Sequence, residues 1–221
     1  MLVFLEGGVA VGKSTLLSKL EKRGYKVIYE PVDAWMNMRV KPDSESLFEL
    51  YYKDKKRYGF MFQMVALQSR IAHINEIVQE AQAKAGDTLL ICERSFFTDH
   101  QVFAKMLLEQ TIITDEEYYV YKMWYDYLLT LINPTVSGII YLKASPEVCA
   151  SRIVKRGRQG EEGIDLEYLR QLDKQHENWL INEPSNFPVH VIDGNVENLE
   201  VTSDLVDFLD ALVINKVVTG V

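Results

Sequence analysis

The chain has 221 residues, of which 48% are hydrophobic, and a formal net charge of −8 at pH 7. This length and apolar content suit a single globular domain over residues 1–221, while the acidic balance argues against a general binder of nucleic acids or membrane surfaces. No apolar run reaches the roughly 18 residues of a membrane span, and no signal or transit segment precedes the opening MLVFLEGG, so we expect a soluble cytoplasmic protein.

Five short apolar runs are typical of strands that are buried on both faces. They cover Leu2–Glu6, 26–30, 88–93, 138–143 and Val189–Asp193. Helical patterns alternate with them, over Lys13–Lys22, 45–53, 60–85, 100–108, 115–131, Pro146–Arg156, 167–182 and 203–216. Such alternation predicts βαβ units and a doubly wound α/β fold around a parallel sheet.

The region 60–131 is mostly helical and rich in aromatic and methionine residues. We expect most of them to form core or a helix–helix dimer face, and a few to line a ligand site. Cys92 and Cys149 lie in apolar runs without CxxC spacing, which favours two reduced core thiols. A disulfide between them stays open until their geometry is known.

The stretch GGVAVGKS, residues 7–14, matches the P-loop pattern and lies between a predicted strand and a predicted helix. In such a loop, backbone N–H groups bind phosphates, Lys13 reaches the β/γ-phosphates and the Ser14 hydroxyl is a Mg²⁺ ligand. The phosphate-binding residues are then Gly7, Gly8, Val9, Ala10, Val11, Gly12, Lys13, Ser14 and Thr15. No DxxG motif follows, which disfavours a GTPase switch.

Glu30 and Glu93 each stand at the end of a predicted strand. Glu30 ends one apolar run directly before a proline, and Glu93 ends another, followed by Arg94. Open α/β sheets bind ligands at the carboxyl ends of their strands. Phosphoryl transfer to a hydroxyl uses one carboxylate to accept the proton, another to support the metal, and cations to stabilise the transferring group. The alternative is a structural ion pair.

The densest basic cluster lies in RIVKRGRQGEEG, residues 152–163, with Arg152, Lys155, Arg156 and Arg158. A solvated helix end is the ordinary interpretation of such a run. Beside a P-loop, the cluster instead indicates a mobile lid that brings arginines onto a triphosphate.

Together these motifs resemble the deoxynucleoside kinase family, in an order that covers essentially the whole chain. The matching pieces are the P-loop, EPVDAW, YYKD, FMFQ, ERSFFTD, IYLKASPEVC, RGRQGEEGIDLEYL and HENWL. The resemblance implies a P-loop kinase fold, with a five-stranded parallel sheet flanked by helices and a lid at about 156–165. It also implies ATP-dependent, Mg²⁺-assisted phosphorylation of a deoxynucleoside, as in nucleotide salvage, by a homodimer that has no nucleic-acid or membrane partner.

The same resemblance implies roles for single residues. Glu30 would be the general base for the 5′-hydroxyl with Arg94 beside it, and Glu93 would assist Mg²⁺ together with Ser14. Gln63 would bind the base through its amide, Trp35, Phe62 and Phe103 would wall the base, and Tyr52 and Glu161 would hold the sugar 3′-hydroxyl. Arg152, Arg156 and Arg158 would belong to the lid, and the DGNVEN loop at Asp193 would border the donor's adenine. Phe62 and Phe103 keep the alternative of being plain core residues.

The lid departs from the family pattern at two positions. Gly160 stands where the first glutamate of RGRxEE is expected, so a shift of one residue would put Glu162 rather than Glu161 on the sugar. Asp165 replaces a frequent proline between lid and helix. Both changes point to a lid more flexible than usual.

Arg70 and Asp99 bear on the choice of base. Family members that prefer deoxycytidine or purine deoxynucleosides resemble this chain in having an Arg/Asp pair there. A carboxylate can accept from an exocyclic amine, whereas thymine offers a carbonyl and a methyl. We therefore expect the protein to prefer deoxycytidine, deoxyadenosine or deoxyguanosine to thymidine as its substrate. The sequence does not rank the three preferred nucleosides. A plain buried salt bridge is the alternative for this pair.

Two rival functions are a nucleoside monophosphate kinase on the same fold and a non-catalytic nucleotide-binding regulator. A monophosphate acceptor would need cations where Glu30 stands, and a regulator would not need the base, the metal carboxylate and the lid arginines together. ATP or another triphosphate as donor is not distinguished by the sequence.

Overall fold

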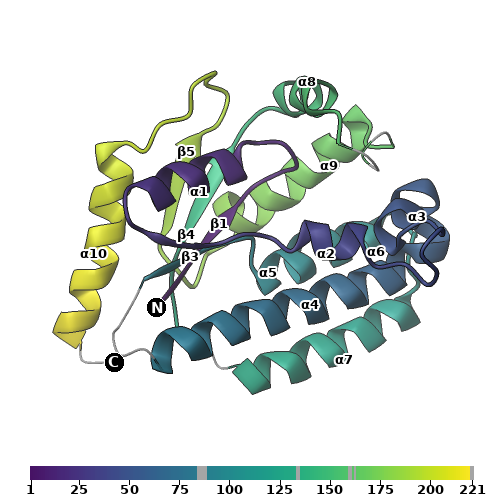
Figure 1. Ribbon diagram of the computed structural model, residues 1–221, viewed down its shortest axis with the longest axis horizontal. Helices are drawn as coiled ribbons and strands as arrows, with labels where there is room; N and C mark the ends of the chain where they lie inside the picture. The colour runs from purple at the N-terminus through teal and green to yellow at the C-terminus, as the bar shows by residue number, and fades with distance from the viewer. Residues whose placement is uncertain (84–88, 133–134, 159–160, 162, 220–221) are drawn as a thin grey trace.

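A parallel sheet runs through the centre of the molecule (Figure 1). The computed structural model describes residues 1–83, 89–132, 135–158, 161 and 163–219. Within them, five strands pair in the order β2-β3-β1-β4-β5. The strands are β1 (Leu2–Glu6), β2 (Lys26–Ile28), β3 (Leu90–Glu93), β4 (Val136–Lys143) and β5 (Val189–Asp193), and every pair is parallel. The predicted α/β fold is confirmed.

Ten α-helices and two π-helical stretches cover this sheet among the described residues. The α-helices are α1 (Lys13–Lys22), α2 (Val32–Met36), α3 (Leu47–Lys53), α4 (Lys55–Ala83), α5 (Phe96–Thr98), α6 (Lys105–Glu109), α7 (Asp115–Ile132), α8 (Pro146–Arg156), α9 (Leu166–Glu177) and α10 (Ser203–Thr219). The π-helical stretch Asp99–Ala104 joins α5 to α6, and Asn178–Asn182 continues α9.

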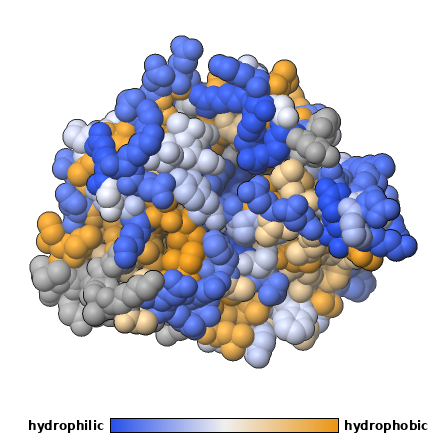
Figure 2. Space-filling model, viewed as in Figure 1, coloured by the Kyte–Doolittle hydropathy of each residue, from blue (hydrophilic) through white to orange (hydrophobic). Residues whose placement is uncertain are grey.

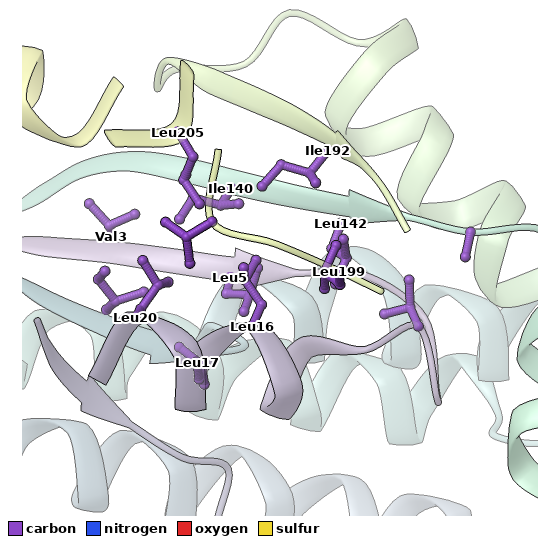
Figure 3. Close-up of a cluster of buried hydrophobic side chains, with 14 of the residues drawn as sticks. Val3, Leu5, Leu16, Leu17, Leu20, Ile140, Leu142, Ile192, Leu199 and Leu205 are labelled. Carbon is purple, nitrogen blue, oxygen red and sulfur yellow. The ribbon is translucent and has the colours of Figure 1, made fainter. Parts of the chain in front are cut away.

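Alternate residues of the central strand β1 pack on opposite faces of the sheet, as the strand period of two requires. Val3 and Leu5 pack with α1 and α10, in the cluster shown in Figure 3. Leu2 and Phe4 pack on the other face with α4, α5 and α7. Both faces are therefore buried, which explains why the strands read as continuous apolar runs.

Most predicted elements are present, and the differences have local causes. Helix α4 begins at Lys55, five residues before its predicted start, because the Asp54 carboxylate accepts from the backbone N–H of Arg57. Strand β2 ends at Ile28, two residues short of the prediction. Helix α2 was not predicted, since five residues are too few to show a helical period. Residue 88, the predicted start of β3, lies outside the described residues.

Helix α8 forms as the sequence predicts, with the Ser145 hydroxyl accepting from the backbone N–H of Val148 and Pro146 in the first turn. Cys92 and Cys149 are both buried and unpaired, as expected of core thiols. Burial raises the pKa of both thiols, which keeps them protonated. None of the helices in the described part of the chain is long and apolar enough to cross a membrane.

Candidate active site

The P-loop connects β1 to α1 and depends on two glycines. Gly7 has φ +142°, and a Cβ there would lie 2.2 Å from the carbonyl oxygen of Leu142. Gly12, with φ +114°, directly precedes α1. Other residues rarely adopt these angles. The Lys13 ammonium donates to the carbonyl oxygens of Gly8 at 2.8 Å and Gly7 at 3.2 Å, so it lies across the mouth of the loop.

The end of β3 brings a carboxylate to the P-loop. The Ser14 hydroxyl lies 3.2 Å from each carboxylate oxygen of Glu93, and Lys13 Nζ lies 4.0 Å from Glu93 Oε1. A hydroxyl and a carboxylate are oxygen ligands of the kind that Mg²⁺ prefers. Among the described residues no group of three or more His, Cys, Asp or Glu forms a protein-only metal site. Ser14 and Glu93 therefore fit an ion that takes its other ligands from phosphates and water.

Arg94 turns the chain sharply after β3. Its backbone is left-handed, with φ +61°, and its N–H donates to the carbonyl oxygen of Leu5 at 2.9 Å. The turn directs its guanidinium to Glu30, with Arg94 Nε 3.4 Å from Glu30 Oε1. Its Nη1 is buried without a hydrogen-bond partner among the described residues, so one donor remains for a ligand.

Glu30 is surrounded by positive charge. Burial raises the pKa of this carboxyl, but Arg70 and Arg94 outweigh that effect and bring the pKa below its usual value. Lys13 acts in the same direction. Burial lowers the pKa of Lys13 to about 8. At neutral pH the site thus holds an ionised carboxylate among cations.

Arg70 and Asp99 form a buried pair. Arg70 Nε lies 2.8 Å from Asp99 Oδ2, and Arg70 Nη2 lies 3.2 Å from Oδ1. The same Nη2 lies 2.9 Å from Glu30 Oε1, a contact that the sequence did not predict. Burial lowers the pKa of Arg70, but the two carboxylates raise it above its usual range, which keeps the guanidinium charged.

These side chains line a cavity of about 340 Å³. All ten residues predicted to bind the nucleoside lie on its wall, namely Glu30, Trp35, Tyr52, Phe62, Gln63, Arg70, Arg94, Asp99, Phe103 and Glu161. Several further wall residues were not predicted from the sequence, among them Phe48, Tyr51, Ala66 and Tyr168. The missed aromatic residues carried only an apolar signal, which does not separate a cavity wall from core.

The aromatic residues of the cavity support one another. Trp35 and Phe62 meet edge to face with centroids 5.7 Å apart, and Tyr51 stacks on Phe62 at 4.7 Å. The Arg94 guanidinium lies 5.1 Å from the centroid of Phe103. Phe62 and Phe103 thus pack against other side chains and also line the cavity. Each can be both a core residue and a wall of the base site.

Gln63 is buried between α4 and the π-helical stretch. Its Nε2 donates to the backbone carbonyl oxygen of Asp99 at 3.0 Å. This bond fixes the amide plane and uses one of its two N–H donors. The Oε1 acceptor remains for a base edge, while the second N–H lies within reach of the Tyr121 phenol.

The arginines of the predicted lid contact Glu161 on the cavity wall. Arg156 Nη2 lies 2.7 and 2.5 Å from the two Glu161 oxygens, and Arg158 Nη1 lies 3.5 Å from Oε1. Glu161 is buried, whereas Gly160 and Glu162 lie outside the described residues. The Asp165 carboxylate caps α9 by accepting from the backbone N–H of Tyr168, which gives this departure from the family pattern a local role.

A second cavity of about 400 Å³ adjoins the first at the P-loop. The two share Ala10, Lys13, Ser14, Glu93, Arg156 and Arg158. Arg152 donates to the backbone oxygens of Val11 and Val196, at 2.9 and 3.0 Å, and so joins the P-loop to the loop after β5. Asp193 does not line this cavity, because its carboxylate accepts from Asn195 within that loop. Val196, Glu197 and Leu199 line it instead.

Glu6 is a buried polar residue for which the sequence predicted no role. Its carboxylate accepts from the backbone N–H of Ser95 at 2.9 Å and from the Thr98 hydroxyl. Burial raises the pKa of Glu6, although hydrogen bonds from the side chains of Ser95 and Thr98 lower it. The signal was present, since a glutamate closes the apolar strand directly before Gly7.

Comparisons with known proteins agree with this geometry. A model of the deoxynucleoside kinase family matches residues 3–218. The chain is 33% identical to deoxycytidine kinase 2 of Gallus gallus, over 87% of this chain and 82% of the relative. It is 32% identical to deoxycytidine kinase of Homo sapiens, over 96% and 87%. It is 34% identical to mitochondrial deoxyguanosine kinase of Xenopus laevis, over 80% and 71%.

Proposed function

The chain belongs to the deoxynucleoside kinase family, whose members phosphorylate deoxynucleosides at the expense of ATP, and we propose that residues 1–221 form one catalytic domain of this kind. The first cavity binds the deoxynucleoside, and the second binds the phosphates and adenine of ATP. The observation that carries this proposal is the place where the cavities meet. There Glu30 lines the first cavity, where the acceptor binds, and Lys13 and Ser14 line both cavities.

The chemistry follows from this arrangement. Glu30 accepts the proton of the 5′-hydroxyl, and the 5′-oxygen forms a bond to the γ-phosphorus. The bond from that phosphorus to the β–γ bridging oxygen breaks and leaves ADP. Lys13, Arg94 and the lid arginines stabilise the charge on the transferring group. Bound Mg²⁺, held by Ser14 and Glu93, would neutralise phosphate charge.

The cavity also supports a mode of nucleoside binding. Gln63 offers its Oε1 acceptor to the base edge, and the aromatic rings of Trp35, Phe62 and Phe103 provide flat walls. Tyr52 and Glu161 hold the 3′-hydroxyl. We assign the sugar contact to Glu161 because its buried carboxylate lines the cavity.

Base preference is proposed to depend on the Asp99 carboxylate, which accepts from an exocyclic amine while Arg70 holds it in place. Deoxycytidine and the purine deoxynucleosides are therefore expected to be better substrates than thymidine. Competitive rates on the four deoxynucleosides test this, and thymidine as the best substrate would contradict it. The double variant R70M/D99A should move the preference toward thymidine.

ADP release measured with and without an acceptor tests the reaction itself. We expect release that depends on an unphosphorylated deoxynucleoside. Dependence on a monophosphate would support a monophosphate kinase, and no stimulation by either would support a regulator. Glu30→Gln should retain nucleoside binding and lose turnover by about 10²- to 10⁴-fold, the usual contribution of a general base.

We further infer that the protein is a homodimer, because α7 exposes an apolar face that includes Tyr119, Met123 and Tyr127. Its acidic charge supports small-molecule substrates rather than nucleic acid as ligands.

A further inference from the structure

Arg70 connects two carboxylates that belong to different parts of the proposed site. Asp99 comes from the π-helical stretch that faces the base, and Glu30 comes from the chain after β2. One guanidinium on α4 contacts both, with Arg70 Nη2 lying 3.2 Å from Asp99 Oδ1 and 2.9 Å from Glu30 Oε1. The exposed fractions of the three side chains are 3% for Arg70, 1% for Asp99 and 13% for Glu30.

The guanidinium has little freedom to move. It lies 5.3 Å from the ring of Trp35, and the Trp35 indole N–H donates to the Ser69 hydroxyl at 2.8 Å. A guanidinium is rigid and planar, so its donors keep fixed positions relative to one another. Because the same Nη2 contacts Asp99 and Glu30, a shift of Asp99 displaces the atom that holds Glu30.

We propose that Arg70 is a positioning residue for Glu30, and that it transmits the choice of nucleobase at Asp99 to the carboxylate that accepts the 5′-hydroxyl proton. Arg70 and Arg94 approach the same oxygen, Oε1, which leaves Oε2 to accept the proton of the 5′-hydroxyl. This inference deepens the proposed function and rests on Glu30 as the general base.

The charges around Glu30 set the direction of the expected effect. Three cations act on Glu30 directly, namely Arg70 on α4, Arg94 at the end of β3 and Lys13 at the start of α1. Asp99, on the π-helical stretch, acts through its ion pair with Arg70. The phenol of Tyr52, on α3, is a further titratable neighbour. Loss of the Arg70 cation leaves Glu30 with Arg94 and Lys13, so its carboxylate becomes easier to protonate. The Arg70–Asp99 pair then changes the protonation of Glu30 even when the nucleoside remains bound.

The test compares D99A with R70M/D99A, because neither variant leaves a buried Asp99 carboxylate without its partner. D99A keeps the Arg70–Glu30 contact and the double variant lacks it. We expect the acid limb of the kcat/KM–pH profile to lie about one pH unit higher in R70M/D99A, the usual scale for one neighbouring charge. The same deoxynucleoside and saturating MgATP serve both variants, so ionisation of the substrates cancels.

R70K/D99A is the conservative control, since it retains a cation at the same place and should return the acid limb toward that of D99A. Acid limbs that coincide in D99A and R70M/D99A would overturn the inference and leave Arg70 as a structural partner of Asp99. Should R70M/D99A fail to fold, R70Q/D99N removes the same two charges with closer shapes and replaces it.

Glu30→Gln separates this inference from the proposed function. An active E30Q would remove Glu30 as the base and with it the proposed function. An inactive E30Q together with an unshifted acid limb in R70M/D99A would contradict only the role of Arg70.

Discussion

At the proposed sugar end of the cavity, Tyr52 is the residue whose contribution is easiest to isolate. It lines the cavity beside Glu161, and burial raises its pKa well above the usual value. The phenol therefore stays neutral and can donate a hydrogen bond. Glu161 is paired with Arg156 and Arg158, so the proposed sugar contact and the proposed lid meet at this carboxylate.

Tyr52→Phe should raise KM for deoxynucleosides about tenfold, because it removes one hydrogen bond of roughly 1.4 kcal/mol to the 3′-hydroxyl. The matching 2′,3′-dideoxynucleosides lack that hydroxyl and should show no change. Steady-state kinetics on both substrate classes measures the difference. Tyr58→Phe, on a tyrosine outside the cavity wall, is the control. An equal loss on both classes would show that the Tyr52 hydroxyl acts on packing and not on the sugar.

At the scale of elements, the helical segment of α5, the π-helical stretch and α6 carries Asp99 and Phe103 and is anchored at its start by Glu6. Glu6→Ala would leave the Ser95 N–H and the Thr98 hydroxyl without their acceptor. Buried unsatisfied groups cost about 1–3 kcal/mol each, so we expect the free energy of unfolding to fall by about 2–4 kcal/mol. Glu6→Gln keeps an oxygen for the Ser95 N–H and should lose less. Urea unfolding measures both, and equal losses would contradict this role.

The pH dependence of stability has a defined sign at Glu6. Its pKa is raised on folding, so the folded protein binds a proton more tightly there than the unfolded chain does. The stability that comes from this proton is fully present below the unfolded pKa and is lost as pH rises through the folded pKa. Glu6→Gln removes this dependence, so its stability relative to the wild type should improve as pH rises. A difference that is constant with pH would contradict the raised pKa.

Local sequence patterns predicted the elements that depend on local signals. The bounds of α1 and α8 follow from the P-loop and from a Ser-Pro cap, and the apolar runs predicted the strands. The family resemblance supplied some contacts between distant residues, such as Ser14 with Glu93. Neither it nor the local patterns gave Arg70 with Glu30 across 40 positions or Glu6 with Thr98 across 92. Asp193 shows the same limit, because whether a loop carboxylate faces a cavity or its own loop depends on backbone geometry.

At the scale of the whole molecule, one apolar surface has no counterpart within the described residues. On α7, Tyr121 and Tyr125 are buried, while the other face exposes Tyr119, Met123, Trp124, Tyr127 and Leu131 by 48–67%. Hydrophobic residues reach the surface at the lower edge of Figure 2, where Figure 1 places α7. A patch of aromatic and methionine residues on one helix face is typical of a protein interface.

A two-fold interface would place α7 against its own copy. Sedimentation velocity at micromolar concentration should then show a species of twice the 25.5 kDa chain mass. The variant M123E/Y127E should sediment as the single chain, because each substitution brings like charges together across the two-fold axis and buries them in an apolar surface. Val154→Glu changes an equally apolar but isolated residue that is 83% exposed on α8, and it should leave the dimer intact. A wild-type protein that sediments as a single chain would contradict the homodimer.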